Sequence, residues 1–544
     1  MLRKIRIVLA ILFFVLITLL FLDFTGTIHA WFGWMAKIQF LPAVLALNVG
    51  VVVGLVVLTL LFGRVYCSVI CPLGVMQDLV SWFSGRRRKH RNRFAWTKAR
   101  TWLRWTVLVL FVAIMAAGLG SLGALIAPYS AYGRIVQSLL APLYAWGNNL
   151  LAWAAERVDS YAFYSVDVWL KSLPTLLIAV ITFAVLFVLA WRGGRTWCNT
   201  ICPVGTVLGA LARFSLFKPR FDTAKCNGCK LCARNCKASC IDPVAHTIDY
   251  SRCVACMDCL EHCRQGAISY TWRRPKPTET LKPTAKQTAK PAAEPAETPN
   301  PAPKPAAGPE KPEKKPVAAP AAEVASKEDE AADTPVDASR RRFLGVVGLM
   351  VGAAVHAQEK KVDGGLALIE KKRAPERSTP LVPPGARGLR EFLAHCTACQ
   401  LCVTVCPNQV LRPSGDLMRL MKPEMSYERG YCRPECTKCA EVCPTDAIHL
   451  TELCEKSSIQ IGHAVWISEN CVVNTDGVSC NNCERHCPTG AIHLVPSDPD
   501  NKQSLCIPTV DEERCIGCGA CENLCPARPF SAMVVEGHER HKTL

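Results

Sequence analysis

Closely spaced cysteines constrain this 544-residue chain more than any other feature, because tight runs contain most of its 31 cysteines. The runs have the form Cys-x2-Cys-x2-Cys-x3-Cys or a near variant, whereas a small disulfide scaffold spreads its cysteines along the chain. Four thiolates at this spacing hold a [4Fe–4S] cluster. A zinc site would explain a single Cys-x-x-Cys pair but not a series of complete quartets. The runs therefore predict a protein that binds several iron–sulfur clusters.

The first two runs form the tandem pattern of a two-cluster bacterial ferredoxin, over residues 221–275. In that pattern the fourth cysteine of each run ligates the cluster of the other run. Lys237 and Arg264 replace the usual proline after the fourth cysteine, and Cys240 is an alternative ligand to Cys236, although the spacing favours Cys236. The predicted ligands are Cys226, Cys229, Cys232 and Cys263 for one cluster, and Cys236, Cys253, Cys256 and Cys259 for the other.

Four further runs predict a four-cluster ferredoxin domain at residues 385–544, and a proline follows the last cysteine of each run. We expect nested ligand exchange, in which Cys525 completes the first cluster and Cys406 the last, while Cys487 and Cys443 are exchanged between the inner runs. With the first domain, this predicts six [4Fe–4S] clusters. The ligands in these runs are Cys396, Cys399, Cys402, Cys406, Cys432, Cys436, Cys439, Cys443, Cys471, Cys480, Cys483, Cys487, Cys515, Cys518, Cys521 and Cys525.

Four long apolar stretches precede the first ferredoxin, at roughly 5–22, 41–62, 103–122 and 173–191. A membrane-spanning helix needs ~20 mainly apolar residues. Four such stretches predict a domain of four transmembrane helices over residues 1–220, although a buried core helix is the alternative for any one. Lys and Arg gather at the N-terminus and between the second and third stretches, which places these segments in the cytoplasm. The expected fold class is an α-helical membrane domain joined to α+β bacterial-type ferredoxin modules.

A Cys-x-x-x-Cys-Pro element follows the second apolar stretch and recurs after the fourth. GRVYCSVICPLG begins at Gly63, and GRTWCNTICPVG begins at Gly194. This repeat predicts a duplicated two-span unit, and cysteines four apart share one helix face. If a pseudo-two-fold axis relates the units, the four thiols converge. They would then hold a metal, form a redox dithiol, or only pack as buried thiols do. These cysteines are Cys67, Cys71, Cys198 and Cys202; the others outside the runs are Cys240, Cys454 and Cys506.

The remaining polar and aromatic patterns narrow the function. His29 lies just beyond the first apolar stretch and no histidine lies within any of the four, which disfavours a bis-histidine haem in the membrane. Residues 121–171 are rich in aromatic and aliphatic residues. They predict an interfacial amphipathic helix, beneath which a quinol head group could dock; a plain surface helix is the alternative. The net charge of +18 does not indicate nucleic acid, because much of it lies beside apolar segments and in a linker.

Residues 276–338 consist mainly of Pro, Ala, Lys and Glu and predict a disordered linker. Residues 339–358 then contain paired arginines at Arg340 and Arg341, a short apolar region, and small residues at Val355 and Ala357. These are the parts of a twin-arginine export signal or anchor, with a chance basic–apolar junction as the alternative. Clusters are built in the reducing cytoplasm, so an exported ferredoxin domain must cross the membrane already folded.

These motifs resemble those of two families of respiratory proteins. Residues 1–275 resemble the NapH family of membrane ferredoxins, with four spans, two Cys-x-x-x-Cys-Pro elements and a cytoplasmic two-cluster ferredoxin. Residues 339–544 are similar to the NapG family, with a twin-arginine signal and four [4Fe–4S] motifs. The membrane half is also similar to NosR and to CcoG, the latter linked with copper oxidase assembly. The chain looks like a natural fusion of NapH-type and NapG-type parts.

This resemblance implies a multi-pass protein of the bacterial inner (cytoplasmic) membrane that acts as a quinol dehydrogenase in anaerobic respiration. Electrons would pass from the quinol pool through the clusters to a periplasmic reductase, such as a nitrate reductase, or to its electron-transfer subunit. The first ferredoxin domain would be cytoplasmic and the second periplasmic. One alternative is a redox maturation factor for a respiratory metalloenzyme, as for NosR and CcoG. Another keeps both ferredoxin domains in the cytoplasm. Signatures for molybdenum, flavin or haem attachment are absent, which favours an electron conduit over a terminal reductase.

Overall fold

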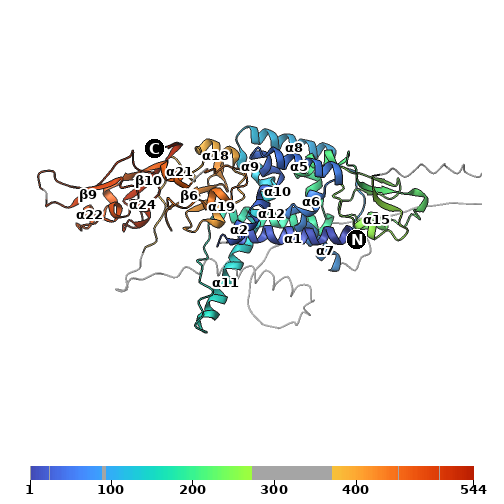
Figure 1. Ribbon diagram of the computed structural model, residues 1–544, viewed down its shortest axis with the longest axis horizontal. Helices are drawn as coiled ribbons and strands as arrows, with labels where there is room; N and C mark the ends of the chain where they lie inside the picture. The colour runs from blue at the N-terminus through green and yellow to red at the C-terminus, as the bar shows by residue number, and fades with distance from the viewer. Residues whose placement is uncertain are drawn as a thin grey trace, which may run out of the picture. The chain divides into compact units, whose positions relative to one another are not determined.

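The computed structural model describes residues 2–23, 25–87, 94–272, 370–450, 453–501 and 503–543 (Figure 1). These residues belong to one compact unit, formed by the segments Met1–Pro275 and Lys360–Leu544. The predicted linker and the twin-arginine segment, with its cleavage after Ala357, lie outside the described residues. The side chain of Cys454 lies outside them as well.

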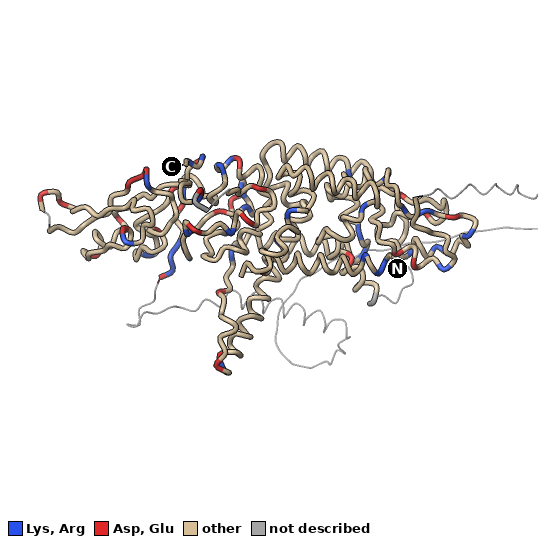
Figure 2. The backbone as a smooth tube through the Cα atoms, viewed as in Figure 1, with Lys and Arg blue, Asp and Glu red and all other residues tan. Residues whose placement is uncertain are grey.

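Two helices in the described part of the chain are long and apolar enough to cross a membrane: α1 (Leu2–Leu22) and α12 (Leu173–Gly193). Each has 21 residues, and at 1.5 Å per residue such a helix is about 30 Å long, which matches the hydrocarbon core of a bilayer. Charged residues are sparse along the helices and gather in the ferredoxin modules (Figure 2).

The expectation of four spans is corrected, because the other two apolar stretches form shorter helices. Helix α5 (Val49–Phe62) has 14 residues and α8 (Thr101–Ala116) has 16. The second stretch is interrupted where Leu47 takes a positive φ and Asn48 caps α5 by accepting a hydrogen bond from the Val51 backbone N–H at 3.2 Å. This break separates α4 (Phe40–Leu45) from α5. The third stretch is interrupted at Gly118, also with a positive φ, before α9 (Gly120–Ile126).

The predicted duplication is visible in the order of the helices. Helix α5 is followed by the short α6 (Val65–Val69) and then by α7 (Pro72–Arg87). Helix α12 is followed in the same way by α13 (Thr196–Thr200) and α14 (Pro203–Ala212). The two units are interlocked, because α7 packs on α12 and α14 packs on α5. Gly63 and Gly194 end the long helices at φ values of 71° and 65°, where a residue with a Cβ would be strained.

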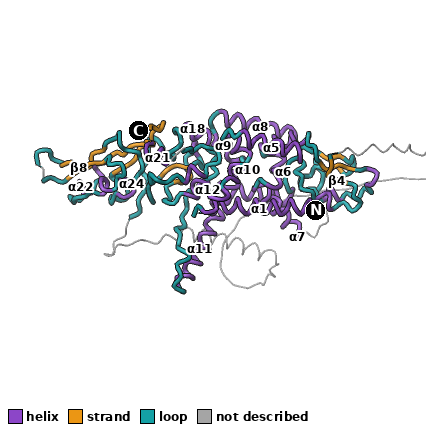
Figure 3. The backbone as a smooth tube through the Cα atoms, viewed as in Figure 1, coloured by secondary structure: helices purple, strands orange, loops and turns teal. Residues whose placement is uncertain are grey.

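The first ferredoxin module consists of short elements. Strand β1 (Lys218–Phe221) pairs with β4 (Ile268–Thr271), and β2 (Ile241–Asp242) pairs with β3 (Thr247–Ile248), both antiparallel. Helices α15 (Leu231–Arg234) and α16 (Asp258–Glu261) carry the third cysteine of each run. The module is thus an α+β fold of loops, short helices and two-stranded sheets (Figure 3).

The second ferredoxin module repeats this plan. Its antiparallel pairs are β5 (Leu411–Pro413) with β6 (Pro423–Met425), β7 (Ile459–Trp466) with β10 (Met533–Thr543), and β8 (Ile492–Pro496) with β9 (Cys506–Val510). Its helices are short: α18 (Leu389–His395), α19 (Leu401–Val405), α20 (Lys438–Glu441), α21 (Leu453–Ser458), α22 (Val472–Thr475), α23 (Asn482–Arg485) and α24 (Ala520–Leu524). The predicted α+β ferredoxin fold is therefore confirmed for both modules.

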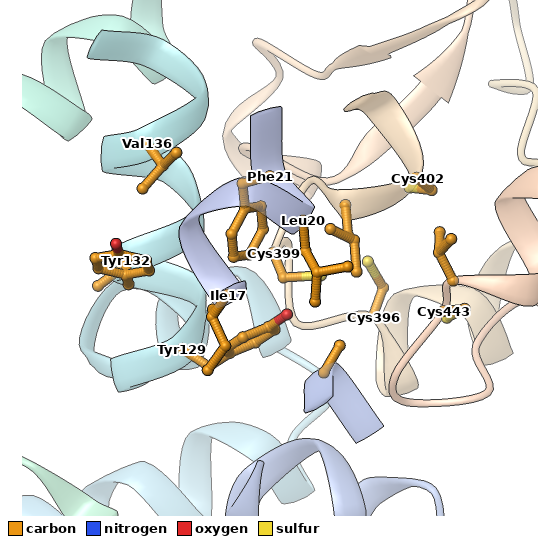
Figure 4. Packing of buried hydrophobic residues seen from close by; sticks show 14 of the residues in the cluster. Ile17, Leu20, Phe21, Tyr129, Tyr132, Val136, Cys396, Cys399, Cys402 and Cys443 are labelled. Carbon is orange, nitrogen blue, oxygen red and sulfur yellow. The ribbon is translucent and has the colours of Figure 1, made fainter. Parts of the chain in front are cut away.

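Helix α1 contacts one ferredoxin module at each of its ends. Near its N-terminus, Arg3 forms ion pairs with Asp258 at 2.7 Å and Glu261 at 2.6 Å in the first module. Near its C-terminus, α1 packs against α19 of the second module, where Phe21 lies close to Cys399 (Figure 4). Helix α9 also contacts the second module, since the Ser121 hydroxyl donates to the Met418 carbonyl at 3.1 Å.

The segment after α9 forms α10 (Pro128–Ile135), a π-helical turn at Val136–Leu140, and α11 (Ala141–Glu156). Large apolar side chains of α11, among them Leu150 and Trp153, are exposed. A helix is thus present where the sequence predicts an amphipathic one. Its place at a membrane interface stays a prediction.

The close packing of Gly194 against Lys237 of the first ferredoxin module can be tested by substitution. A Cβ at this position would approach the Lys237 carbonyl oxygen to 2.6 Å, whereas Gly118 has a similar positive φ and no atom within 4 Å. We expect Gly118→Ala to cost about 1–2 kcal/mol from backbone strain alone and Gly194→Ala to cost clearly more. Thermal unfolding in detergent measures both, and equal melting temperatures would contradict this packing.

Candidate iron–sulfur centres

The first module gathers its cysteines into the two predicted groups. Cys226, Cys229, Cys232 and Cys263 line one small cavity, and Cys236, Cys253, Cys256 and Cys259 line another. The second cavity also contains Cys240, whose sulfur lies 3.5 Å from that of Cys236. The predicted exchange of the fourth ligand in this module therefore agrees with the structure, with Cys240 as an additional thiol at the second group.

The second module pairs neighbouring runs, so the nested exchange predicted from the sequence is wrong. Cys443 completes the first quartet, as Figure 4 shows, and Cys406 lies with the second run. Cys525 lies with the third run and Cys487 with the fourth. The quartets are Cys396, Cys399, Cys402 and Cys443; Cys406, Cys432, Cys436 and Cys439; Cys471, Cys480, Cys483 and Cys525; and Cys487, Cys515, Cys518 and Cys521.

The backbone around the four runs of standard spacing fits an anionic cluster. In each run, the residues immediately before and after the second cysteine have positive φ: Gly228 and Lys230, Ala255 and Met257, Ala398 and Gln400, Gly517 and Gly519. A residue other than glycine seldom adopts this conformation. Alternating right- and left-handed residues form a concave nest of backbone N–H groups that binds anions, including Fe–S centres. The thiols and this nest together suit the [4Fe–4S] group that the spacing predicts.

The quartets of the second module lie next to one another. The Cys432 N–H donates to the Cys518 carbonyl at 2.9 Å, which joins the second quartet to the one containing Cys487. That quartet is joined in turn to the quartet containing Cys525, because α23 packs on α24. The first quartet lies at the end of α1 (Figure 4). The module therefore arranges its thiol groups as a series leading away from α1.

The cysteines of the two Cys-x-x-x-Cys-Pro elements converge as predicted. Cys67, Cys71, Cys198 and Cys202 are all buried, with 4–6% of each residue exposed. Burial and then the neighbouring thiols raise the pKa of Cys71 and of Cys202, so the four cysteines share one environment. Two fully buried arginines, Arg64 and Arg195, accompany them. These arginines were not predicted from the sequence, although the Gly-Arg dipeptide that precedes each element was a signal for them.

A cavity of about 510 Å³ adjoins the second module near Cys406. Its walls come from distant parts of the chain: Phe21 of α1, Gln137 of the π-helical turn, residues 164–172, and residues around Thr404 and Cys406. Lys171 lies in this wall, and burial lowers the pKa of its ammonium group to about 8. With its amide oriented to suit its neighbours, Gln137 accepts a hydrogen bond from Lys171 Nζ at 2.5 Å and donates to the Phe21 carbonyl at 3.1 Å. No sequence motif indicated Gln137 or Lys171.

A site for a single metal ion differs from a site for an iron–sulfur cluster. In the part of the chain that the structure describes, no group of three or more His, Cys, Asp or Glu side chains is arranged to hold one metal ion. Cys506 of β9 is unpaired among the same residues.

The fold and the thiol quartets define a polyferredoxin, a protein that carries electrons through several [4Fe–4S] clusters. Family models support this class. A model described as a 4Fe-4S binding domain matches residues 44–90 and 175–222, which contain the two Cys-x-x-x-Cys-Pro elements. A 4Fe-4S dicluster domain matches residues 395–447 and 478–528, and a further 4Fe-4S binding domain matches residues 246–269. Each match to the dicluster domain spans cysteines of two neighbouring runs, which agrees with the pairing in the structure.

Comparison with curated relatives defines the type of ferredoxin protein more closely. The chain is 34% identical over 167 residues to the methylamine utilization ferredoxin-type protein MauM of Methylobacillus flagellatus, which covers 30% of this chain and 70% of MauM. It is 27% identical over 245 residues to the ferredoxin-type protein NapH of Escherichia coli, covering 43% of this chain and 70% of NapH. An uncharacterized protein of Methanocaldococcus jannaschii is 36% identical over 94 residues, covering 17% of this chain; the chain spans 37% of that relative.

The chain belongs to the family of ferredoxin-type proteins that includes MauM. It is a NapH/MauM-like electron-transfer protein with 4Fe-4S domains. No solved structure matches it significantly.

The pairing of neighbouring runs can be tested with double variants. Cys399 and Cys443 belong to one quartet in the structure, so Cys399→Ser and Cys443→Ser together should remove about four irons, no more than either alone. Cys399→Ser with Cys525→Ser affects two quartets and should remove about eight. Iron and sulfide analysis of the anaerobically purified protein measures the loss. Nested exchange would reverse the two results.

Proposed function

We propose that the protein is a membrane-bound quinol dehydrogenase, and that it passes electrons through its [4Fe–4S] clusters to a periplasmic reductase, such as a nitrate reductase, or to that enzyme's electron-transfer subunit. The observation that carries this proposal is the cavity beside Cys406. It is large enough for a small organic ring, since ligand pockets typically measure ~300–1,000 Å³. It adjoins a thiol quartet, and it opens among residues that flank both long apolar helices.

The contacts of α1 support a membrane arrangement. Arg3 at one end binds the first ferredoxin module, and the other end packs on the second module. A helix of this length spans the hydrocarbon core. The two modules would therefore lie on opposite sides of the bilayer. The basic N-terminus favours the cytoplasm for the first module, which leaves the periplasm for the second.

The lining of the cavity suits a quinol. Apolar residues such as Phe21, Leu176 and Val403 would enclose the ring, and the polar groups of Gln137 and Lys171 would hold its hydroxyl groups. Oxidation of a quinol to a quinone releases two electrons and two protons. When bound, the clusters accept the electrons one at a time. Lys171, with its lowered pKa, would donate a hydrogen bond to the bound ring. The side of the cavity where Ser165 and Asp167 are exposed would let protons leave.

The series of quartets in the second module would set the direction of electron transfer. The quartets nearest α1 and the cavity would accept them, and the quartet completed by Cys525 lies furthest along the series. We expect the redox partner to dock near this last quartet. The ferredoxin-type names of NapH and MauM support electron transfer to a partner protein.

Anaerobic reduction by quinol tests this function. A menaquinol analogue is added to membranes that contain the protein, and the EPR signals of the clusters are followed. We expect rapid reduction that an inhibitor of quinol sites blocks. If dithionite reduced the clusters and quinol did not, the dehydrogenase would be wrong and a maturation role for the clusters would replace it.

Lys171 provides a second test. Lys171→Met keeps the volume of the side chain but removes its charged donor. A hydrogen bond to a charged group contributes about 1.5–3 kcal/mol, so the rate of cluster reduction by quinol should fall by about 10- to 100-fold. Reduction by dithionite should not change. Lys225→Met, at an exposed lysine of the first module, is the control. If quinol reduced the clusters at the same rate in both variants, Lys171 would not be part of the quinol site.

A further inference from the structure

Two buried lysines lie beside the first and second quartets of the second ferredoxin module. Lys456 belongs to α21 and is 4% exposed, and Lys422 directly precedes β6 and is 2% exposed. A lysine is almost never fully buried unless its charge is paired. Neither lysine lines the cavity that contains Lys171, so the proposed quinol site does not account for them.

The ammonium group of Lys456 lies at the second quartet. It lines the small cavity that contains the four cysteines of that quartet. Its Nζ donates to the Cys436 carbonyl at 2.5 Å and also to the Arg433 carbonyl. Burial raises the pKa of the Cys432 thiol, and Lys456 lowers this pKa through its charge and a hydrogen bond. Lys456 therefore acts directly on a predicted cluster ligand.

Lys422 lies in a similar way at the first quartet. Its Nζ donates to the Leu393 carbonyl, in the last turn of α18 and three residues before Cys396. Burial raises the pKa of Cys396 to about 11, and the charge of Lys422 lowers it. Among the described residues, neither Lys422 nor Lys456 forms an ion pair with a carboxylate. The negative charge that faces these lysines is therefore that of the quartet cysteines once they are ligated.

The charge of a ligated quartet becomes more negative when its cluster is reduced. Metal coordination deprotonates each cysteine, and reduction then adds one electron. A buried cation attracts the reduced cluster more strongly than the oxidised one, because this attraction grows with charge and is weakly screened in a protein interior. Net charge, hydrogen bonds to sulfur and burial set the reduction potentials of iron–sulfur clusters. Each lysine should therefore shift its cluster to a higher potential.

The quartet of the fourth run has a different charge environment. Glu522 directly follows the third cysteine of this run and is 2% exposed. Arg377 pairs with the Glu522 carboxylate at 2.5 Å, which makes the pair neutral. Lys372, whose Nζ donates to the Cys525 carbonyl at 2.9 Å, is also influenced by the charge of Glu522. A carboxylate thus offsets cation charge here, in contrast to the first and second quartets.

We propose that Lys456 and Lys422 raise the reduction potentials of the second and first clusters of this module. Quinols are mild reductants, so a cluster that accepts their electrons needs a higher potential than an ordinary ferredoxin cluster. If the proposed quinol dehydrogenase function holds, the lysines make the two clusters beside the cavity its electron acceptors. Each cluster takes one electron, so together they accept both electrons of one quinol, whose two protons leave separately. The effect on the potentials does not depend on that function.

The midpoint potential of the second cluster, in the full-length, anaerobically purified protein, tests this proposal. It is measured by redox titration with chemical mediators, and the EPR signal of this cluster is the one that Cys439→Ser removes. Lys456→Gln keeps a hydrogen-bond donor but removes the charge. At a fixed potential, the ratio of reduced to oxidised cluster should fall at least about tenfold, which is a midpoint about 59 mV lower for one electron. The iron content should equal that of the wild type.

Two further variants separate the effect of charge from that of packing. Lys456→Arg keeps the charge, so its midpoint should stay closer to the wild-type value than to that of Lys456→Gln. Lys542→Met changes an exposed lysine of the same module and should leave the midpoint unchanged. An unchanged midpoint in Lys456→Gln, or equal shifts in Lys456→Gln and Lys456→Arg, would overturn the proposal.

The wild type provides a second measurement in case the Lys456 variants lose the cluster. Its first and second clusters should be reduced at a higher potential than the cluster of the fourth run, and Cys399→Ser and Cys518→Ser identify the signals of the first and fourth. An equal or higher potential for the fourth-run cluster would overturn the proposal. Neither measurement uses quinol, so failure of reduction by quinol would contradict the dehydrogenase function and leave this result unaffected.

Discussion

Cysteines share the buried core of both ferredoxin modules with apolar side chains such as Ile241, Phe392 and Val535. Their sheets have two strands each, and many of their helices have only four residues. Such elements are marginal on their own in water. Several cysteines are among the buried residues, including Cys236, Cys259, Cys396 and Cys521. When clusters bind, ligation energy becomes folding energy. The arrangement of the quartets therefore determines both the stability of the modules and the path that electrons take.

Helix α1 connects the two ferredoxin modules through a segment that is long enough to cross a membrane. Its length matches a bilayer core, and it meets a different ferredoxin module at each end, through Arg3 at one and Phe21 at the other. The interlocked units formed by α5–α7 and α12–α14 place four further buried cysteines next to the first module. The cysteine-rich modules and the apolar helices thus belong to one compact unit. This continuity distinguishes the chain from a soluble ferredoxin attached to an anchor.

Local spacing in the sequence was enough to predict some features and not others. The standard runs and the convergence of Cys67 with Cys198 followed from spacing and from the repeat. The pairing of Cys443 with the first run did not, because it depends on which runs fold back on each other. The lengths of the helices were also not predicted correctly from the sequence. Asn48 is a single polar residue in a long apolar stretch, yet it caps a new helix there. The cavity near Lys171 combines four distant segments, which no local pattern reveals.

The most direct test of the central claim is the sidedness of the two ferredoxin modules. Lys225 of the first module and Lys542 of the second are both exposed, so they form a matched pair for an amine reagent that cannot cross membranes. In intact spheroplasts we predict modification of Lys542 but not of Lys225, with Lys225 modified only after lysis, as mass spectrometry would show. If both lysines reacted only after lysis, the two modules would share the cytoplasmic side and the proposed path across the membrane would be wrong.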